Sequence, residues 1–245
     1  AAAGRSSRWH LARPALAAAS ARAAMGDQGT IREHEVYFAT LAEQAERYDE
    51  MAEHMRAACM FDQELDAEER NLLAVAYKQA VGQRRSAWRI VSNVEIGEKA
   101  KGNAMTEAKA REYRKVIESE LKMHCEHILA LLADQLLPRA TTAEAKVSYY
   151  KAQGDYHRYI AEISDNVNKT NATRAAKQSY EDGTRIAEVS LPVTSSFRLG
   201  LALNHAVFYY EVMSAPAEAV RIGRKAFEDA VREMSNRSGE EGAKE

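Results

Sequence analysis

The sequence ERNLLAVAYKQAVGQRRSAWR, residues 69–89, decides the fold that we expect for this chain. Its apolar side chains recur every three or four residues, which is the period of an amphipathic helix. Lys78, Arg85 and Arg89 form a second, basic stripe. Lys78 and Arg85 are seven residues apart, so they lie on one helix face with Cα atoms ~10 Å apart. Two long cationic side chains in this arrangement can reach one anion, although ordinary solvated charges are the alternative interpretation.

The same period continues through most of the chain and predicts an all-α fold. Four prolines, twelve glycines and few β-branched runs leave little from which a sheet could form. Asp66 with Glu69, and Thr141 with Glu144, have the spacing of capping boxes that open helices, and Pro138 marks a helix end. We expect helices over about 31–45, 48–60, 66–96, 105–136, 141–164, 172–189, 195–213 and 216–234.

Composition limits the classes of function. The chain has 34 basic and 36 acidic residues, a formal charge of −2, so affinity for an anion must come from a local cluster. Nucleic acid is therefore not a favoured partner. Cys59 and Cys125 both fall within helical patterns, which favours reduced thiols in a cytoplasmic or nuclear compartment. The longest apolar run, residues 128–133, is far shorter than the ~20 residues that a membrane-spanning helix needs.

The two ends of the chain differ from the helical middle. Residues 1–24 contain eleven alanines, four arginines and no acidic residue, the composition of an organelle transit peptide. No apolar periodicity links this segment to the next one, so we expect residues 1–30 to be a disordered or leader-like extension, with Met25 as the natural start. Residues 31–234 form the helical domain, and residues 235–245 form a polar tail that we expect to be disordered.

A second stripe that can bind an anion lies on the helix expected at 141–164. Lys151, Asp155 and Arg158 follow one another at spacings of four and three, with Tyr159 beside them. Asp155 can orient Arg158 for bidentate contact with a planar anion, while the Tyr159 hydroxyl adds a neutral donor. Phosphate, with about two negative charges and three strong acceptor oxygens, suits this set. Surface ion pairs of little energetic worth are the alternative.

A third stripe lies in RLGLALNHAVFYYE, residues 198–211. Leu203 and Val207 supply apolar surface, and Asn204 and Glu211 form a polar edge beside it. Asn204 can offer one donor and one acceptor to an extended peptide backbone. Alternatively, it is an asparagine that bonds only to a neighbouring helix.

Five ordered blocks resemble one known family, the 14-3-3 phosphopeptide-binding adaptors. The blocks are LAEQAERYDEMA (41–52), EERNLLAVAYKQAVGQRRSAWR (68–89), AREYRKVIESEL (110–121), KAQGDYHRYIAE (151–162) and RLGLALNHAVFYYE (198–211). The resemblance covers about residues 31–234. It implies an all-α fold of antiparallel helices that dimerises through its N-terminal helices into a cup with one amphipathic groove per protomer.

The resemblance also implies roles for individual residues, with neither catalysis nor a cofactor. Phosphoserine or phosphothreonine in a partner protein would be bound by Lys78, Arg85, Arg158 and Tyr159. Lys151, Asn204 and Glu211 would contact the flanking peptide, and Leu203 and Val207 would form the apolar wall. The resemblance implies a dimer contact, in a homodimer or a heterodimer, at Leu41, Arg47, Tyr48, Glu50, Ala87, Tyr113 and Glu120.

Two departures from the family pattern bear on function. Family members usually have a ninth helix facing the peptide, and nothing after Met234 is expected to supply it. Many members also carry a serine that splits the dimer when phosphorylated, where this chain has Ala87. We therefore keep a structural dimeric protein with impaired peptide binding as an alternative function.

A di-iron enzyme of the ferritin-like kind is the other alternative, because helical proteins of this size can house such a centre. That site needs Glu-x-x-His pairs, and none of the seven histidines has a glutamate three residues before it. His124 and His127 could supply two ligands from one helix, but helix-surface or core histidines are the preferred interpretation. We expect no metal and no catalytic residue.

Overall fold

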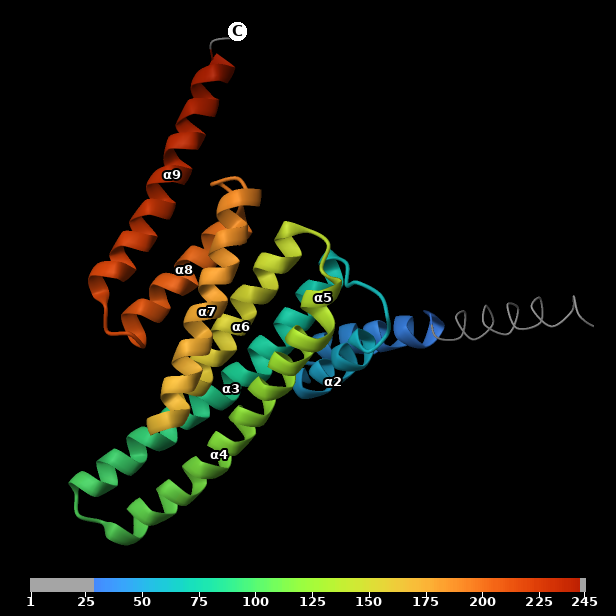
Figure 1. Ribbon diagram of the computed structural model, residues 1–245. Coiled ribbons are helices and arrows are strands. Elements are labelled where there is room, and N and C mark those ends of the chain that lie inside the picture. Colours follow the sequence, from blue (N-terminus) through green and yellow to red (C-terminus); the bar gives the residue numbers. More distant parts are fainter. Residues whose placement is uncertain (1–28, 243–245) are drawn as a thin grey trace, which may run out of the picture. The chain divides into compact units, whose positions relative to one another are not determined.

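The structure is a computed structural model that describes residues 29–242, with side chains described as far as residue 236 (Figure 1). Residues 1–28 and 243–245 lie outside the described residues, and with them most of the predicted extension and the end of the polar tail. The chain divides into two compact units, one ending at Ala76 and the other beginning at Tyr77.

The first unit contains a helix over residues 29–44, helix α2 (Tyr48–Cys59) and the beginning of α3 (Ala67–Ala100). The Arg32 guanidinium is buried and donates two hydrogen bonds, of 2.7 and 2.6 Å, to the Glu69 carboxylate. The predicted capping box at Asp66 and Glu69 is confirmed: each backbone N–H donates to the other residue's carboxylate, at 2.9 and 3.0 Å. Glu69 therefore both caps α3 and attaches it to the helix over residues 29–44.

The second unit contains the rest of α3 and the remaining helices. They are α4 (Ala104–Leu131), η1 (Leu132–Leu136), α5 (Leu137–Arg139), α6 (Ala143–Ile163), α7 (Asn166–Ser190), α8 (Ser196–Glu211) and α9 (Pro216–Gly242). Since α4, η1 and α5 follow one another without a break, residues 29–242 contain eight helices in sequence and no strand. The predicted all-α fold is confirmed. None of the described helices is long and apolar enough to cross a membrane.

The core of the second unit determines which faces of α6, α7 and α8 are buried against other helices and which faces can carry the polar stripes. Helix α6 packs mainly on α7, and α8 packs mainly on α9 (Figure 1). The buried cluster consists of Val147 from α6, Ala176, Tyr180 and Ala187 from α7, Leu191 after it, and Leu201 and Phe208 from α8. Because these side chains are buried against one another, the polar stripes of the same helices are displayed at the edge of the core.

Two predicted helix ends agree with the structure. Helix α3 passes through Gly97 and ends at Ala100, within the polar stretch over 97–103 that was expected to end it. The helical segment that begins with α4 continues through a π-helical turn at residues 132–136 and ends at Arg139, one residue after Pro138.

Three other helix ends differ from the prediction. The N-cap of α6 is Thr142, one residue later than predicted, and its hydroxyl accepts from the Ala145 N–H at 3.2 Å. Helix α7 begins at Asn166, earlier than expected, and α9 continues past Met234 to Gly242. The polar composition after Met234 had suggested disorder, but Ser, Asn, Arg and Glu have helix propensities that allow the helix to continue.

Candidate functional site

Two arginines from different helices meet over one phenol ring. The guanidinium carbon of Arg85, on α3, lies 3.8 Å from the centre of the Tyr159 ring, and that of Arg158, on α6, lies 4.7 Å from it. Both distances fall within the range of a cation–π contact. We call Arg85, Arg158 and Tyr159 the arginine cluster.

Lys78 lies two turns before Arg85 on the same face of α3. Its side chain is exposed and makes no ion pair with another described residue. It is therefore a cation that can turn toward an incoming anion without first breaking a contact.

Arg158 keeps its charge despite its burial. Only 7% of the residue is exposed. Burial would lower the pKa of its guanidinium, but the neighbouring Tyr180, Tyr159 and Asp155 raise the pKa above its ordinary value. Its Nη1 donates to Glu211 at 3.0 Å, while its contacts with Asp155 and the Tyr159 hydroxyl are longer, 3.5 Å each. Glu211 is thus its nearest carboxylate.

Asp155 was predicted to orient Arg158, and in the structure Asp155 also accepts hydrogen bonds from three other residues. Its carboxylate accepts from the Lys151 ammonium at 2.8 Å, from the Asn204 amide at 2.8 Å to each oxygen, and from the Tyr180 hydroxyl at 2.6 Å. The Asp155 residue is 7% exposed. It therefore joins α6, α7 and α8 at one buried acceptor, and two of the predicted peptide contacts already converge on it.

Tyr180 is a site residue that sequence reasoning missed. Its position in the apolar period of α7 assigns it to the core, and it is indeed fully buried. Nothing in the sequence shows that its hydroxyl reaches Asp155. Burial, together with the Asp155 charge, raises the pKa of Tyr180, so the hydroxyl stays protonated and donates. A Cβ at Gly154 would lie 2.6 Å from the Tyr180 ring, so glycine is needed there for the ring to fit.

Glu162 is the second missed residue. Its Oε2 accepts from Arg85 Nε at 2.9 Å, and its Oε1 accepts from Arg89 at 2.5 and 2.9 Å. Burial alone would raise the pKa of Glu162, but the charge of Arg85 and the arginine hydrogen bonds outweigh it and lower the pKa. A signal was present, because Glu162 follows Arg158 by one helical turn within a block already singled out.

Helix α8 brings the predicted peptide contacts to the same region. Asn204 is bonded to Asp155 and Glu211 to Arg158, while Leu203 is 62% exposed. Val207 lines a shallow pocket of about 280 Å³ between α8 and α9, together with Ala206, Tyr210, Glu211, Ala219 and Val220. The polar and apolar edges predicted for α8 are therefore both accessible.

The residues predicted to form the dimer contact fall in both units. In the first unit, Leu41 is exposed, Tyr48 is half-buried, and Arg47 forms an ion pair with Glu50. In the second, Tyr113 is exposed, Ala87 is half-buried, and Glu120 forms an ion pair with Arg84 at 3.3 Å. Arg47 and Glu120 therefore each have a partner within their own unit, and their pairing across subunits stays a prediction.

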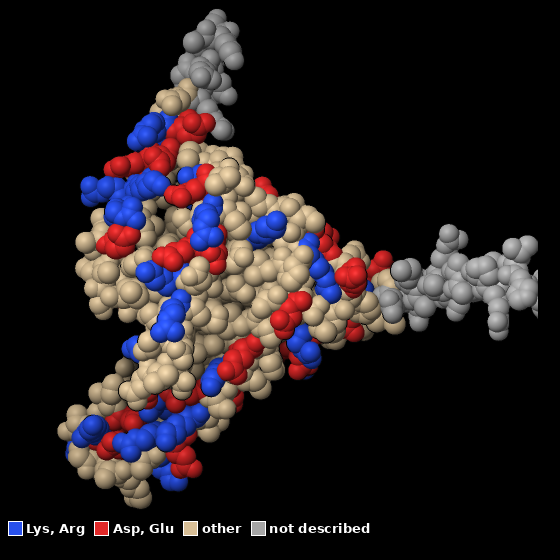
Figure 2. All heavy atoms as spheres, in the orientation of Figure 1, with Lys and Arg blue, Asp and Glu red and all other residues tan. Residues whose placement is uncertain are grey.

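The surface charge is mixed. Figure 2 shows basic and acidic side chains interleaved over the visible face, in keeping with the near balance of 34 basic and 36 acidic residues. Among the described residues, no three His, Cys, Asp or Glu side chains are grouped so that they could hold a metal ion.

The fold and the site together define an all-α binding protein with a cationic cluster beside an apolar strip. A family model described as 14-3-3 protein matches residues 38–245. The chain is 49% identical over 207 residues to a 14-3-3 protein homolog from Candida albicans, covering 84% of this chain and 78% of the relative. It is also 49% identical over 216 residues to a 14-3-3-like protein from Chlamydomonas reinhardtii, covering 87% and 83%.

The chain therefore belongs to the 14-3-3 family. Proteins of this family are phosphoserine- and phosphothreonine-binding adaptors rather than enzymes, and they dimerise. Nothing in these comparisons favours the alternative of a structural protein with impaired peptide binding.

Proposed function

We propose that this chain binds extended segments of partner proteins that carry phosphoserine or phosphothreonine, and that it clamps, masks or bridges those partners in signalling without catalysing a reaction. The observation that carries the proposal is the approach of Arg85 and Arg158 to one Tyr159 ring. Two guanidiniums and a phenol at this spacing, with Lys78 beside them, match a phosphate dianion in charge and in hydrogen-bond donors.

In the structure, the arginines that would bind the phosphate form ion pairs with carboxylates. Glu162 holds Arg85, and Glu211 holds Arg158. These contacts keep the guanidiniums ordered before a ligand arrives, which lowers the entropy that binding must overcome. The phosphate then adds to or replaces carboxylate contacts, so affinity depends on the phosphoryl group and falls as salt rises.

The flanking peptide is assigned to α6 and α8. Asn204 and Glu211 bind its backbone, Lys151 contacts it from α6, and Leu203 and Val207 cover its apolar side chains. Leu203 already exposes 62% of its surface on α8. Burial of this apolar surface by a bound peptide would make the binding free energy more favourable by about 25 cal/mol per Å².

A dimer built on the predicted contact residues would present two phosphate sites. A partner phosphorylated at two positions then gains effective concentration for its second contact. Homodimers and heterodimers are both compatible with the sequence. We assign the protein to the cytoplasm or the nucleus on the basis of its two buried cysteines, Cys59 and Cys125, which form no disulfide and suit a reducing compartment.

A fluorescence-anisotropy titration tests the proposal. A serine-phosphorylated peptide and its unmodified twin are titrated with the wild-type chain and with Lys78→Glu. We expect the phosphorylated peptide to bind at least a hundredfold more tightly than its twin, and Lys78→Glu to remove most of that difference.

The matched control is Lys109→Glu, which makes the same change of charge at an exposed lysine of α4 outside the proposed site. It should leave peptide binding unchanged. Equal binding of the two peptides to the wild-type chain would overturn the proposed function.

A further inference from the structure

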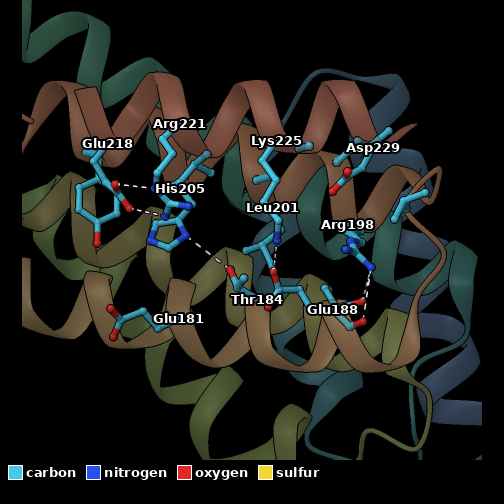
Figure 3. A pocket seen from close by; sticks show the side chains of 17 residues that line it. Glu181, Thr184, Glu188, Arg198, Leu201, His205, Glu218, Arg221, Lys225 and Asp229 are labelled. Carbon is cyan, nitrogen blue, oxygen red and sulfur yellow. Dashed lines mark hydrogen bonds and ion pairs between the residues drawn. The ribbon is translucent and has the colours of Figure 1, made fainter. Parts of the chain in front are cut away.

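A second cavity lies between α7, α8 and α9 (Figure 3). Its volume is about 260 Å³, and its apolar walls come from Val193, Leu199, Leu201, Ala202, Ile222 and Ala226. The α8 residues that line it, which include Leu201 and His205, occupy a different stripe of the helix from Asn204 and Glu211. We call it the α7–α9 cavity, and it shares no residue with the arginine cluster.

The charged side chains around the α7–α9 cavity already have partners. Arg221 donates to Glu218 at 2.5 and 2.7 Å, and Lys225 donates to Glu188 at 2.8 Å (Figure 3). Arg198 donates to the Leu191 carbonyl at 2.9 Å. Glu181 pairs with Lys177 at 3.7 Å, and Asp229 pairs with Arg232 at 3.5 Å. An ionic ligand would compete with one of these ion pairs or with the carbonyls that accept from Arg198, so the cavity favours an uncharged molecule.

One buried polar atom of the cavity wall is not satisfied. His205 is only 6% exposed, and its Nε2 has no hydrogen-bond partner among the described residues. Its Nδ1 lies 3.4 Å from the Thr184 hydroxyl oxygen. That hydroxyl donates its own proton to the Tyr180 carbonyl at 2.7 Å, so it can only accept from Nδ1–H.

This arrangement leaves Nε2 as an unprotonated acceptor. Burial lowers the pKa of His205 to about 4, so the ring is neutral at pH 7. A buried acceptor without a donor costs about 1–3 kcal/mol. A ligand that supplies an O–H or N–H donor relieves that cost.

The size and the neighbouring rings specify the rest of the ligand. A cavity of about 150 Å³ accepts benzene, so 260 Å³ accommodates one or two fused rings with a small substituent. The half-buried Tyr209 ring, which also lines the cavity, lies 5.1 Å from the His205 ring. Aromatic rings pack well in such surroundings.

We propose that the α7–α9 cavity binds a neutral aromatic molecule of one or two rings whose single O–H or N–H donor is accepted by His205 Nε2. The proposal concerns a site separate from the arginine cluster. A failure of phosphopeptide binding would therefore not contradict this proposal, and a failure of this proposal would not contradict phosphopeptide binding.

The test uses phenol and anisole, which have one aromatic ring each and differ in the donor. Each is titrated into ¹⁵N-labelled full chain by NMR. Phenol should bind about fivefold more tightly than anisole, the equivalent of one hydrogen bond of ~1 kcal/mol. In His205→Phe, which keeps an aromatic ring and removes the acceptor, the two affinities should be equal.

A second variant and a direct readout complete the experiment. Ala226→Phe fills the cavity and should abolish the binding of both probes. In the wild-type chain, the ¹⁵N resonance of His205 Nε2 should move with phenol and not with anisole, a readout that does not require His205→Phe to fold. Equal or tighter binding of anisole by the wild-type chain, unchanged binding by Ala226→Phe, or an unmoved Nε2 resonance would each overturn the proposal.

Discussion

The arginine cluster and the α7–α9 cavity lie on different stripes of the same region of the fold, and they differ in what they leave unsatisfied. In the arginine cluster, Arg85 and Arg158 form ion pairs with carboxylates, and the exposed Lys78 has no ion-pair partner among the described residues. Around the cavity the lining carboxylates and Lys225 and Arg221 form ion pairs, Arg198 donates to backbone carbonyls, and a neutral acceptor, His205 Nε2, is left over. From this comparison we infer that the class of ligand depends on which polar groups still lack a partner, and not on the number of charged residues nearby.

The largest effect is expected at Arg158. Arg158→Ala removes a guanidinium that is 7% exposed and leaves Glu211 without its nearest cation. Phosphopeptide affinity should fall at least a hundredfold, which isothermal titration calorimetry can measure. Phenol binding in the α7–α9 cavity should not change.

Arg89→Ala is the matched control for that experiment. Arg89 bonds to the same Glu162 as Arg85 but is 53% exposed at its side chain, so the loss of affinity should stay within about tenfold. Equal losses of phosphopeptide affinity in Arg158→Ala and Arg89→Ala would show that the phosphate responds to the total positive charge of the region and not to direct contact with the buried Arg158.

Gly154→Ala tests the ring that lies between the two regions. The new Cβ would meet the fully buried Tyr180 ring at 2.6 Å, so the free energy of unfolding should decrease by up to about 3 kcal/mol in a urea titration. Gly82→Ala is the control, because no atom lies within 4 Å of its added Cβ within α3, and it should be neutral or stabilise by up to ~1 kcal/mol. A neutral Gly154→Ala would mean that the ring has room to move.

His205 should make stability depend on pH in a way that the arginine cluster does not. Its folded-state pKa of about 4 lies below its ordinary value of 6.5, so between these values the unfolded chain binds more protons and stability falls as the pH falls. The loss from pH 7 to pH 5 should be about 2 kcal/mol. His205→Phe should remove this part of the pH dependence in urea titrations, and an unchanged slope would contradict the assignment.

The smallest effect is expected at Tyr180. Tyr180→Phe removes the donor that reaches Asp155 at 2.6 Å while Lys151 and Asn204 remain bound to that carboxylate. Phosphopeptide affinity should fall about fivefold, equivalent to ~1 kcal/mol, in an anisotropy titration. Tyr150→Phe, on α6, should leave affinity unchanged, and a similar loss in both variants would rule out a specific role for the Tyr180 hydroxyl.

Sequence patterns predicted much of this molecule because helix formation is local. The spacing of Lys78 and Arg85 placed them on one face of a helix, and the structure places them on α3. The family resemblance linked them to Arg158 and Tyr159, and Arg85 does contact the Tyr159 ring. The polar stretch over 97–103 was expected to end that helix, and the helix does end there, at Ala100, because a single glycine at 97 only weakens a helix that its neighbours can continue.

The unpredicted features depend on contacts between distant residues. By itself the sequence determined that the chain is helical, which stripes are basic, and which family it belongs to, since period and motif are properties of neighbouring residues. Only the tertiary structure decided that Tyr180 donates to Asp155 across 25 positions, that Glu162 lies between Arg85 and Arg89, and that His205 Nε2 is left without a donor. Those outcomes depend on how α3, α6, α7 and α8 pack, and packing brings together side chains whose separation in sequence carries no signal.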